Sequence, residues 1–380
     1  EYCENDEQKY GNINDWDVSL IVDMSKLFDC KHGFFVVECT KKIHQFNQPL
    51  DKWNVSNVKN MTEMFRGCNN FNQPLNNWDV SNVANMTEMF YFCHNFNQPL
   101  NNWDVSNVAN MKKMFYFCYN FNQPLNNWDV SSVANMTEMF SGCHNFNQTL
   151  NNWNVSNVTN MASMFYDCCV FNQPLNNWNI SNVKNMSLIF CGCEKFNQPL
   201  NNWNVSNVTN MMGVFYRCEK FNQSLNNWNV SNVTNMGSMF YKCENFNQPL
   251  NNWNVSRVID MSHMFFKCCN FDQMMNDWNI PNIKTMHGIL HYCDKFNHEK
   301  FYVQMIEKNN KSAIIELNKY MPMIKIYHIV QNKDFLTDNI YSYEKYEIQN
   351  FIDNSSIGIC ELCYLEKKCV NNICGLCSLL

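Results

Sequence analysis

The stretch FNQPLNNWDVSNVANMTEMFYFCHN, residues 71–95, recurs with small changes ten times without a break between Phe46 and Lys295. The chain is therefore organised around one 25-residue unit. Self-similarity at a fixed period of roughly 20 to 50 residues is typical of solenoids, whose units bury their apolar residues only by stacking on neighbours. The repeat predicts the fold well and the function poorly.

The spacing of the apolar residues changes halfway through the unit. The first half carries Leu75, Trp78, Val80 and Val83. The alternation from Trp78 to Val80 is typical of a strand. The second half carries apolar residues three and four apart, at Met86, Met89 and Phe90. Asn85 stands three residues before Glu88, as in a helix capping box. We therefore expect one short strand and one short helical turn per unit.

The whole string resembles a known family of repeats. Trp-Asx-Val-Ser-Asn-Val, followed by Asn-Met, Met-Phe, Cys and Phe-Asn-Gln-Pro-Leu, is similar to the BspA-like leucine-rich repeats, also described as mycoplasma-lipoprotein-type 25-residue repeats. The resemblance covers about two thirds of the chain. It implies an α/β repeat solenoid, a leucine-rich-repeat-like right-handed coil used mostly in surface proteins for adhesion and protein contact. It does not imply one shared activity.

The repeat also divides the chain into segments. Residues 1–45 are predicted to form an N-terminal cap with one degenerate coil, at Asn12 to Phe28, and a 12-residue insertion. Residues 46–295 hold the ten repeats, residues 296–356 a partly helical C-terminal cap, and residues 357–380 a Cys-rich tail. Terminal coils are commonly atypical because one of their faces lacks a neighbour.

Three kinds of residue recur at fixed sites and are expected to hold the coils together. All 11 Trp residues occupy one site and are interpreted as a core column, against the alternative of exposed platforms for sugar rings. A second column, one Cys per coil from Cys68 to Cys293, is expected to be buried, which favours a reducing compartment. Asn47, Gln48 and Asn60, with their equivalents, are expected to hydrogen-bond the backbone from coil to coil.

Two exposed faces are candidate binding surfaces. The strand face is predicted to be a uniform Asn/Asp/Ser ribbon with strands about 4.8 Å apart, and it carries Asp79, Asp104 and Asp129. A uniform ribbon suits a repetitive or extended partner, and the alternative is a merely solvated face. Sequence variation concentrates instead on the second half of the unit. There we expect a partner-binding aromatic patch comprising Tyr91, Phe92, Tyr116, Phe117 and Tyr119, against the alternative that these rings pack between coils.

The tail is the best candidate for chemistry. Its two C-x2-C pairs resemble a four-thiolate zinc site formed by Cys360, Cys363, Cys374 and Cys377. A disulfide knot and a thiol-rich tail without metal are the alternatives. His287 and His291, spaced i, i+4, are a weaker metal candidate. With only 10 Gly and scattered acids, the chain shows no nucleophilic triad or phosphate-binding loop, so an enzyme is not expected.

Composition limits the partners further. A net charge of −6 and 16% charged residues disfavour nucleic acid, because no basic stripe meets phosphates. The chain begins at Glu1 and shows no signal peptide or membrane-spanning stretch. The expected function is a non-enzymatic protein-binding or adhesion scaffold, with a cell or virion surface favoured by the family resemblance. The alternatives are a structural rod or coat component, and an intracellular adaptor with a zinc-bound tail.

Overall fold

The computed structural model describes residues 10–29, 45–275, 277–307, 369–370 and 373–374. The chain divides into two compact units, Glu1–Tyr320 and Met321–Leu380, and each is described by itself. In its described part, the first unit contains the 3-10 helix η1 (Ile13–Asp15) and the α-helix α3 (His298–Glu307). The described residues of the second unit form the strands β1 (Cys369–Val370) and β2 (Ile373–Cys374), which pair antiparallel.

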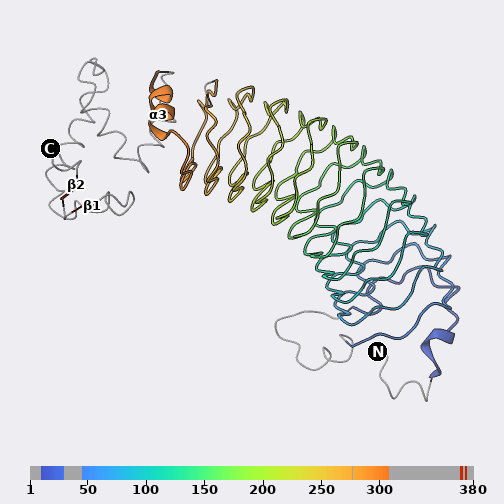
Figure 1. Cartoon of the computed structure of the whole chain (residues 1–380). Helices are drawn as coiled ribbons and strands as arrows, with labels where there is room; N and C mark the ends of the chain where they lie inside the picture. The colour runs from blue at the N-terminus through green and yellow to red at the C-terminus, as the bar shows by residue number, and fades with distance from the viewer. Residues whose placement is uncertain (1–9, 30–44, 276, 308–368, 371–372, 375–380) are drawn as a thin grey trace. The chain divides into compact units, whose positions relative to one another are not determined.

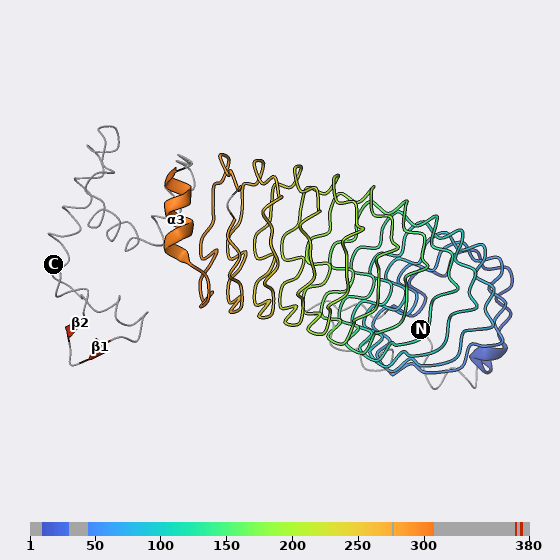
Figure 2. The ribbon, with the colours of Figure 1, turned by 45° about the horizontal axis from the view of Figure 1, so that its top comes forward.

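The first unit is a stack of coils that follows a curve between η1 and α3 (Figure 1 and Figure 2). One isolated parallel bridge joins each coil to the next at the same site of the unit, from Asp23–Asn60 to Asp260–Thr285. The degenerate coil is the first of the stack, because the Met24 N–H donates to the Asn60 carbonyl at 2.9 Å. The predicted repeat solenoid is thus confirmed.

The second half of the unit is not helical. Its backbone N–H groups alternate between two tasks: those of residues 86, 88, 90 and 92 donate to carbonyls of the next coil, and those of residues 89, 91 and 93 close turns within their own coil. Glu88 and Phe92 consequently have φ of 55° and 59°. An α-helix needs a φ of about −63° at every residue. The expected helical turn is therefore wrong, and a run of tight turns takes its place.

The first half of the unit is not a paired strand either. The Trp78 N–H and the Val83 N–H close turns onto carbonyls three residues earlier, at 3.1 and 2.9 Å. Side chains make the links between coils here: Asn82 Nδ2, for example, donates to the Ser56 carbonyl at 2.8 Å. The Trp78 and Trp103 rings lie 6.5 Å apart here, wider than the spacing of about 4.8 Å between paired strands. The expected strand at Trp78–Val80 is thus wrong, and the parallel bridges lie at the Asn85 site instead.

Ring spacings measure how the coils diverge. Equivalent outward rings of the turn segment, such as Tyr91 and Tyr116, lie 4.7 Å apart between centroids. Equivalent interior rings, such as Phe90 and Phe115, lie 5.6 Å apart, and the Trp78 and Trp103 rings lie 6.5 Å apart. Because the spacing grows from the turn segment to the Trp column, the turn segment lies on the inner side of the curve.

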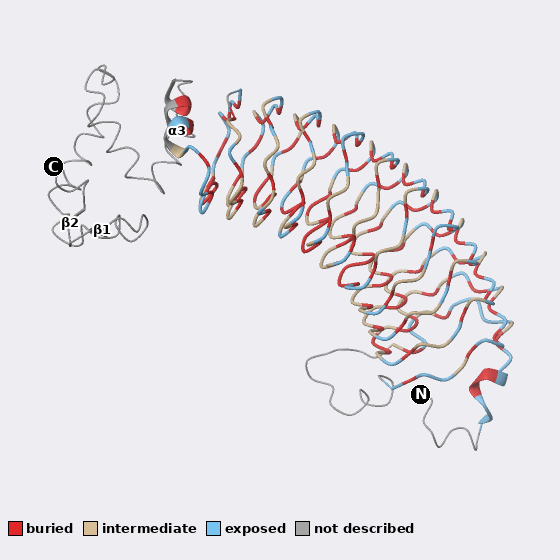
Figure 3. Ribbon diagram, in the orientation of Figure 1, coloured by how far each residue is buried: buried red, intermediate tan, exposed pale blue. Residues whose placement is uncertain are grey.

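The Trp column is core, as predicted. The Trp78 and Trp103 rings are parallel within 1° and only 3% and 2% exposed. From Trp53 to Trp278, each Nε1 donates to a main-chain carbonyl of the preceding coil, as Trp103 does to Leu75 at 2.9 Å. Burial on this scale excludes the alternative of exposed sugar-binding platforms for the coils inside the stack. Figure 3 shows the buried positions recurring from coil to coil.

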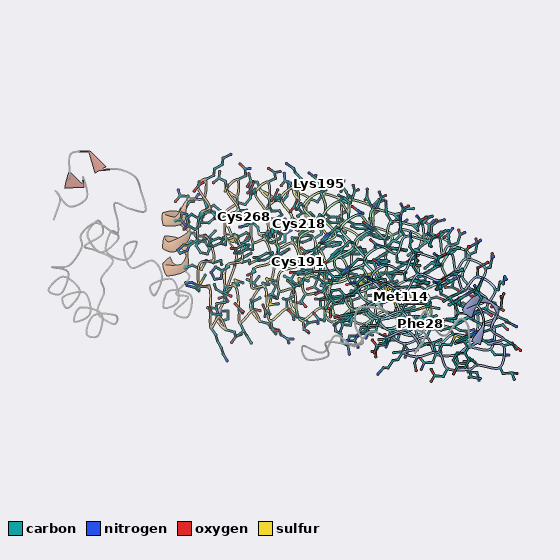
Figure 4. All side chains as sticks on the ribbon, turned by 90° about the horizontal axis from the view of Figure 1, so that it is seen from below. Phe28, Met114, Cys191, Lys195, Cys218 and Cys268 are labelled. Atoms are coloured by element: carbon teal, nitrogen blue, oxygen red, sulfur yellow. The ribbon has the colours of Figure 1, made fainter. Side chains whose placement is uncertain are left out.

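The Cys column is also buried. Cys93, for example, is fully buried, and its Sγ donates to the Phe65 carbonyl of the preceding coil at 3.0 Å. Burial raises the pKa of this thiol well above its usual value. Cys218 and Cys268 of the same column are labelled in Figure 4. Each thiol therefore acts as a small apolar side chain that also satisfies a buried carbonyl.

The predicted amide links to the backbone of the neighbouring coil are confirmed at the Asn47 site and in part at the Gln48 site, where equivalents such as Gln98 and Gln123 donate to an Asn side-chain oxygen instead. Asn47 Oδ1 accepts the Asn72 N–H of the next coil at 2.8 Å, and Gln73 Nε2, at the site equivalent to Gln48, donates to the Asn47 carbonyl at 2.9 Å. Asn60 differs, because its Oδ1 accepts the N–H of Thr62 in its own coil at 3.1 Å. Its side chain shapes a turn instead of linking the backbone of two coils.

Helix α3 closes the last coil. Phe301 and Met305 are 2% and 0% exposed. Gln304 Nε2 donates to the Met275 carbonyl at 3.3 Å, where a Trp of a further coil would otherwise donate. This contact supports a C-terminal cap. The full extent of the proposed cap, residues 296–356, is untested because residues 308–356 lie outside the described part of the chain, as does most of the insertion near residues 30–45.

We predict that Trp153→Phe lowers the free energy of unfolding by roughly 2 kcal/mol, since it removes a buried hydrogen bond and leaves a cavity. Trp153 is 3% exposed and its Nε1 donates to the Leu125 carbonyl at 2.9 Å. Urea unfolding followed by circular dichroism measures the change. Trp16→Phe is the matched control, because Trp16 is 37% exposed in the first coil. Equal losses in both variants would contradict the role of the column.

A second prediction concerns thiol reactivity. Cys169 and Cys269 are partly exposed, whereas Cys143 and Cys243 are fully buried. Burial raises the pKa of all four thiols, and that of Cys143 and Cys243 well above the usual value. Because the thiolate is the reactive form, iodoacetamide at about pH 8 should label the first pair at least roughly tenfold faster. Peptide mass spectrometry on the folded chain measures each site separately. Similar rates for the two pairs would show that the column is open to solvent.

Candidate interaction surfaces

The outward side chains of the turn segment form one surface, which we call the turn face: residues 84–95 and their equivalents in the other coils. It contains the predicted aromatic patch. Tyr91 stacks on Tyr116 at 4.7 Å, and Phe92 stacks on Phe117 at 5.2 Å. Tyr119 meets Phe117 edge-on at 5.6 Å. The structure thus brings the five residues together, and it shows them half-buried and packed from coil to coil.

Cations pack over the patch. The Arg66 guanidinium lies 5.2 Å from the Tyr91 ring centroid, and Lys113 Nζ lies 5.1 Å from that of Tyr116. Both cations are also ion-paired on this face, Arg66 with Glu63 at 2.6 Å and Lys113 with Glu138 at 3.5 Å. Burial raises the pKa of Tyr116 to about 12, so its hydroxyl stays protonated and can donate a hydrogen bond.

Positive φ angles set the directions of the Phe92 and Phe117 side chains in the patch. Phe92 and Phe117 have φ of 59° and 55°. Gly142 occupies the same site in the following coil with φ of 74°, and a Cβ there would lie 2.8 Å from the Phe117 ring. The ring of Phe117 therefore leans over the next coil, and Gly142 provides the room for it.

A second aromatic row lies on the same face nearer α3. Tyr216 stacks on Tyr241 at 4.4 Å, and Tyr241 stacks on Phe266 at 4.7 Å. This row is not among the sites predicted from the sequence. Counting 25-residue steps from Tyr91 and Tyr116 reaches Tyr216 and Tyr241, so the signal was present in the repeat.

The carboxylates of the predicted ribbon serve local structure. Asp79, Asp104 and Asp129 are exposed, and each accepts the N–H of the serine two residues later, at 3.0 to 3.1 Å. Hydrogen bonds from the hydroxyl and the N–H of that serine lower the pKa of Asp79 and of Asp129. Asn54 accepts the N–H of its own serine in the same way at 3.2 Å. Because Asp and Asn make the same contact at this corner, a binding role for the ribbon stays a prediction.

The predicted zinc site cannot be located. Cys360, Cys363 and Cys377 lie outside the described residues, and of Cys374 only the backbone, in β2, is described. Within the described ranges, no three His, Cys, Asp or Glu side chains are grouped so as to hold a metal ion. His287 and His291 have ring centroids 6.4 Å apart. The same part of the chain contains no helix long and apolar enough to cross a membrane.

Histidines gather where the last coil meets α3. The His263 and His287 rings lie 4.9 Å apart, with His291 next to His287. Burial lowers the pKa of His263 and of His291, and the neighbouring histidines lower both further. Burial also lowers the pKa of His298, the first residue of α3. The carboxylate of Asp260 opposes the shift of His263 only partly.

We predict that stability falls as the pH drops from about 7.5 to about 5.5. The unfolded histidines take up protons at about pH 6.5, before the folded ones do, so protonation favours the unfolded chain. Urea midpoints measured across this range test the prediction. His263→Gln with His291→Gln should flatten the dependence, whereas His144→Gln, outside the cluster, is the control. An unchanged slope in the double variant would contradict the prediction.

Comparison with solved structures finds only distant similarity. The TLR13–ssRNA13 complex is 10% identical over 65% of this chain and 48% of that chain, with a TM-score of 0.21. The Toll–Spatzle complex of Drosophila is 10% identical over 63% and 41%, also at 0.21. A leucine-rich repeat protein from Eubacterium ventriosum is 12% identical over 64% and 76%, at 0.26. The chain thus spans less than half the length of the first two.

Comparison with protein families is more informative. No curated protein matches the chain. The model of one family matches residues 2–123, 117–222 and 185–305, which together span most of the chain. That family is described as a Mycoplasma protein of unknown function, DUF285. The chain belongs to this family of repeat proteins.

Proposed function

We propose that the chain is a non-enzymatic scaffold, of the BspA-like leucine-rich-repeat kind, that binds a protein partner through its turn face. One observation carries the proposal: half-exposed aromatic and basic side chains differ from coil to coil on this face, whereas the rest of the unit is nearly uniform. Tyrosine and arginine are enriched among the residues that dominate binding energy at protein interfaces.

Rigidity supports the proposal. Stacking and cation contacts hold Tyr91, Tyr116 and Lys113 in place before any partner arrives. Binding then costs little side-chain entropy. Phe92 and Phe117 have positive φ angles of 59° and 55°, which fix the directions in which their side chains leave the backbone.

The geometry of the array supports it too. The turn face lies on the inner side of the curve, where equivalent residues of successive coils approach most closely. A protein seated there contacts several coils at once. The ribbon corner near Asp79 follows the Trp column, where the coils are widest apart.

We predict that Tyr91→Ser with Tyr116→Ser reduces partner capture at least roughly tenfold, as expected for the loss of two interface anchors. Serine already occupies the equivalent site at Ser141, so the fold accepts it. The measurement is quantitative mass spectrometry of proteins retained by the immobilised chain from extracts and cell surfaces. The matched control replaces Asp79, Asp104 and Asp129 by Asn, the residue at that site in later coils, and should change capture little.

Two results would overturn the proposal. Equal capture by wild type and the tyrosine variant would remove the patch as an anchor. Absence of any retained protein, together with self-association of the chain in light scattering, would favour the structural rod instead.

A further inference from the structure

Three cations stand on consecutive coils of the turn face. Arg217, Lys242 and Lys267 occupy the site that holds Phe92 and Phe117 in earlier coils. Their φ angles are 59°, 57° and 59°. Long side chains rarely adopt this conformation, and glycine adopts it without strain. The array therefore keeps three strained basic residues in a row at a site where other coils carry glycine.

An aromatic row runs beside the cations. Tyr216, Tyr241 and Phe266 stack with interplanar angles of 5°. Since each ring covers the face of its neighbour, the row offers ring edges to a partner, and the Tyr216 and Tyr241 hydroxyls contact each other. Aromatic edges carry partial positive charge, and hydroxyls can donate hydrogen bonds. Both features favour anionic oxygen atoms.

The cations are not neutralised equally. Arg217 pairs with Glu194 at 3.6 Å. Lys242 Nζ and Lys267 Nζ lie 5.9 Å from the Tyr241 and Phe266 ring centroids, and neither makes a salt bridge to a carboxylate of the described residues. Two glutamates, Glu219 and Glu244, stand two residues after Arg217 and Lys242 in the sequence. The two lysines are thus the charges that a partner can meet.

We propose that this stripe, Tyr216, Tyr241 and Phe266 with Arg217, Lys242 and Lys267, docks an extended acidic segment of a protein partner that runs across the coils. The inference rests on the proposed function, because it names the chemistry of a partner of the turn face. Carboxylates of the segment pair with Lys242 and Lys267 and accept hydrogen bonds from the tyrosine hydroxyls. Side chains on one side of an extended chain repeat every ~6.6 Å, a spacing that the long lysine side chains can accommodate.

The test uses the full chain and a fluorescein-labelled peptide of about 12 residues with alternating Glu and Ser. Fluorescence anisotropy should show binding at about 50 mM NaCl that weakens at about 300 mM NaCl, as expected for ion pairing. Lys242→Gln with Lys267→Gln should weaken binding at least roughly tenfold, as expected for the loss of two charge pairs at an interface, and Tyr241→Ser should weaken it severalfold. Lys195→Gln with Lys220→Gln removes the same charge from neighbouring exposed sites and should change affinity little.

Three results of the binding experiment would contradict the inference. Absence of peptide binding at the lower salt concentration overturns the inference. Equal weakening by both double variants also overturns it, because binding would then be non-specific charge attraction. Tighter binding of heparin than of the peptide, lost in the same variants, overturns the partner class in favour of an acidic polysaccharide. If Lys242→Gln with Lys267→Gln leaves protein capture intact while the Tyr91 and Tyr116 variant loses it, the proposed function stands and this inference fails. Unchanged thermal midpoints show that the variants are folded.

Discussion

Each coil depends on hydrogen bonds that its buried side chains give to the coil before it. Trp78 Nε1 donates to the Leu50 carbonyl and Cys93 Sγ to the Phe65 carbonyl, each across 28 residues. A buried carbonyl without a partner is costly, and a 25-residue unit cannot satisfy its own. The coils are therefore stable only as a stack, and the last coil needs another donor for its buried carbonyl. Helix α3 supplies that donor, because its Gln304 donates to the carbonyl of Met275.

The alternation of hydrogen bonds in the turn segment shapes the outer surface. Every second N–H is committed to the next coil and the remaining ones close turns, so the chain reverses repeatedly within a few residues. Those reversals require positive φ at two sites per unit, whichever side chain stands there. Glycine relieves the strain at Gly142 and Gly192, whereas Asp167 and Arg217 retain it. The same backbone that holds the coils together thus presents differing side chains in fixed directions.

The sequence predicts those features that depend on one residue type recurring at one site of the unit. The period, the Trp and Cys columns and the Asn47 ladder follow from identical residues at identical sites. The predicted helical turn is wrong because spacings of three and four residues fit a series of tight turns as well as a helix. Asn85, which looked like a helix cap, instead folds its Oδ1 onto the N–H of Thr87 at 3.0 Å. The row at Tyr216 depends on stacking between coils, which only comparison of equivalent sites brings out.

Curvature connects the packing to the surface. Trp rings separate the coils on one side, by 6.4 Å between Trp178 and Trp203, while hydrogen-bonded backbone draws them together on the other. A stack built in this way must curve toward the turn segment. Equivalent rings of successive coils, such as Tyr216 and Tyr241, are consequently closest where the sequence varies most. The Trp rings in the core and the variable side chains on the turn face are thus linked. The spacing of the Trp rings sets the curvature, and the curvature sets how close together the variable side chains lie.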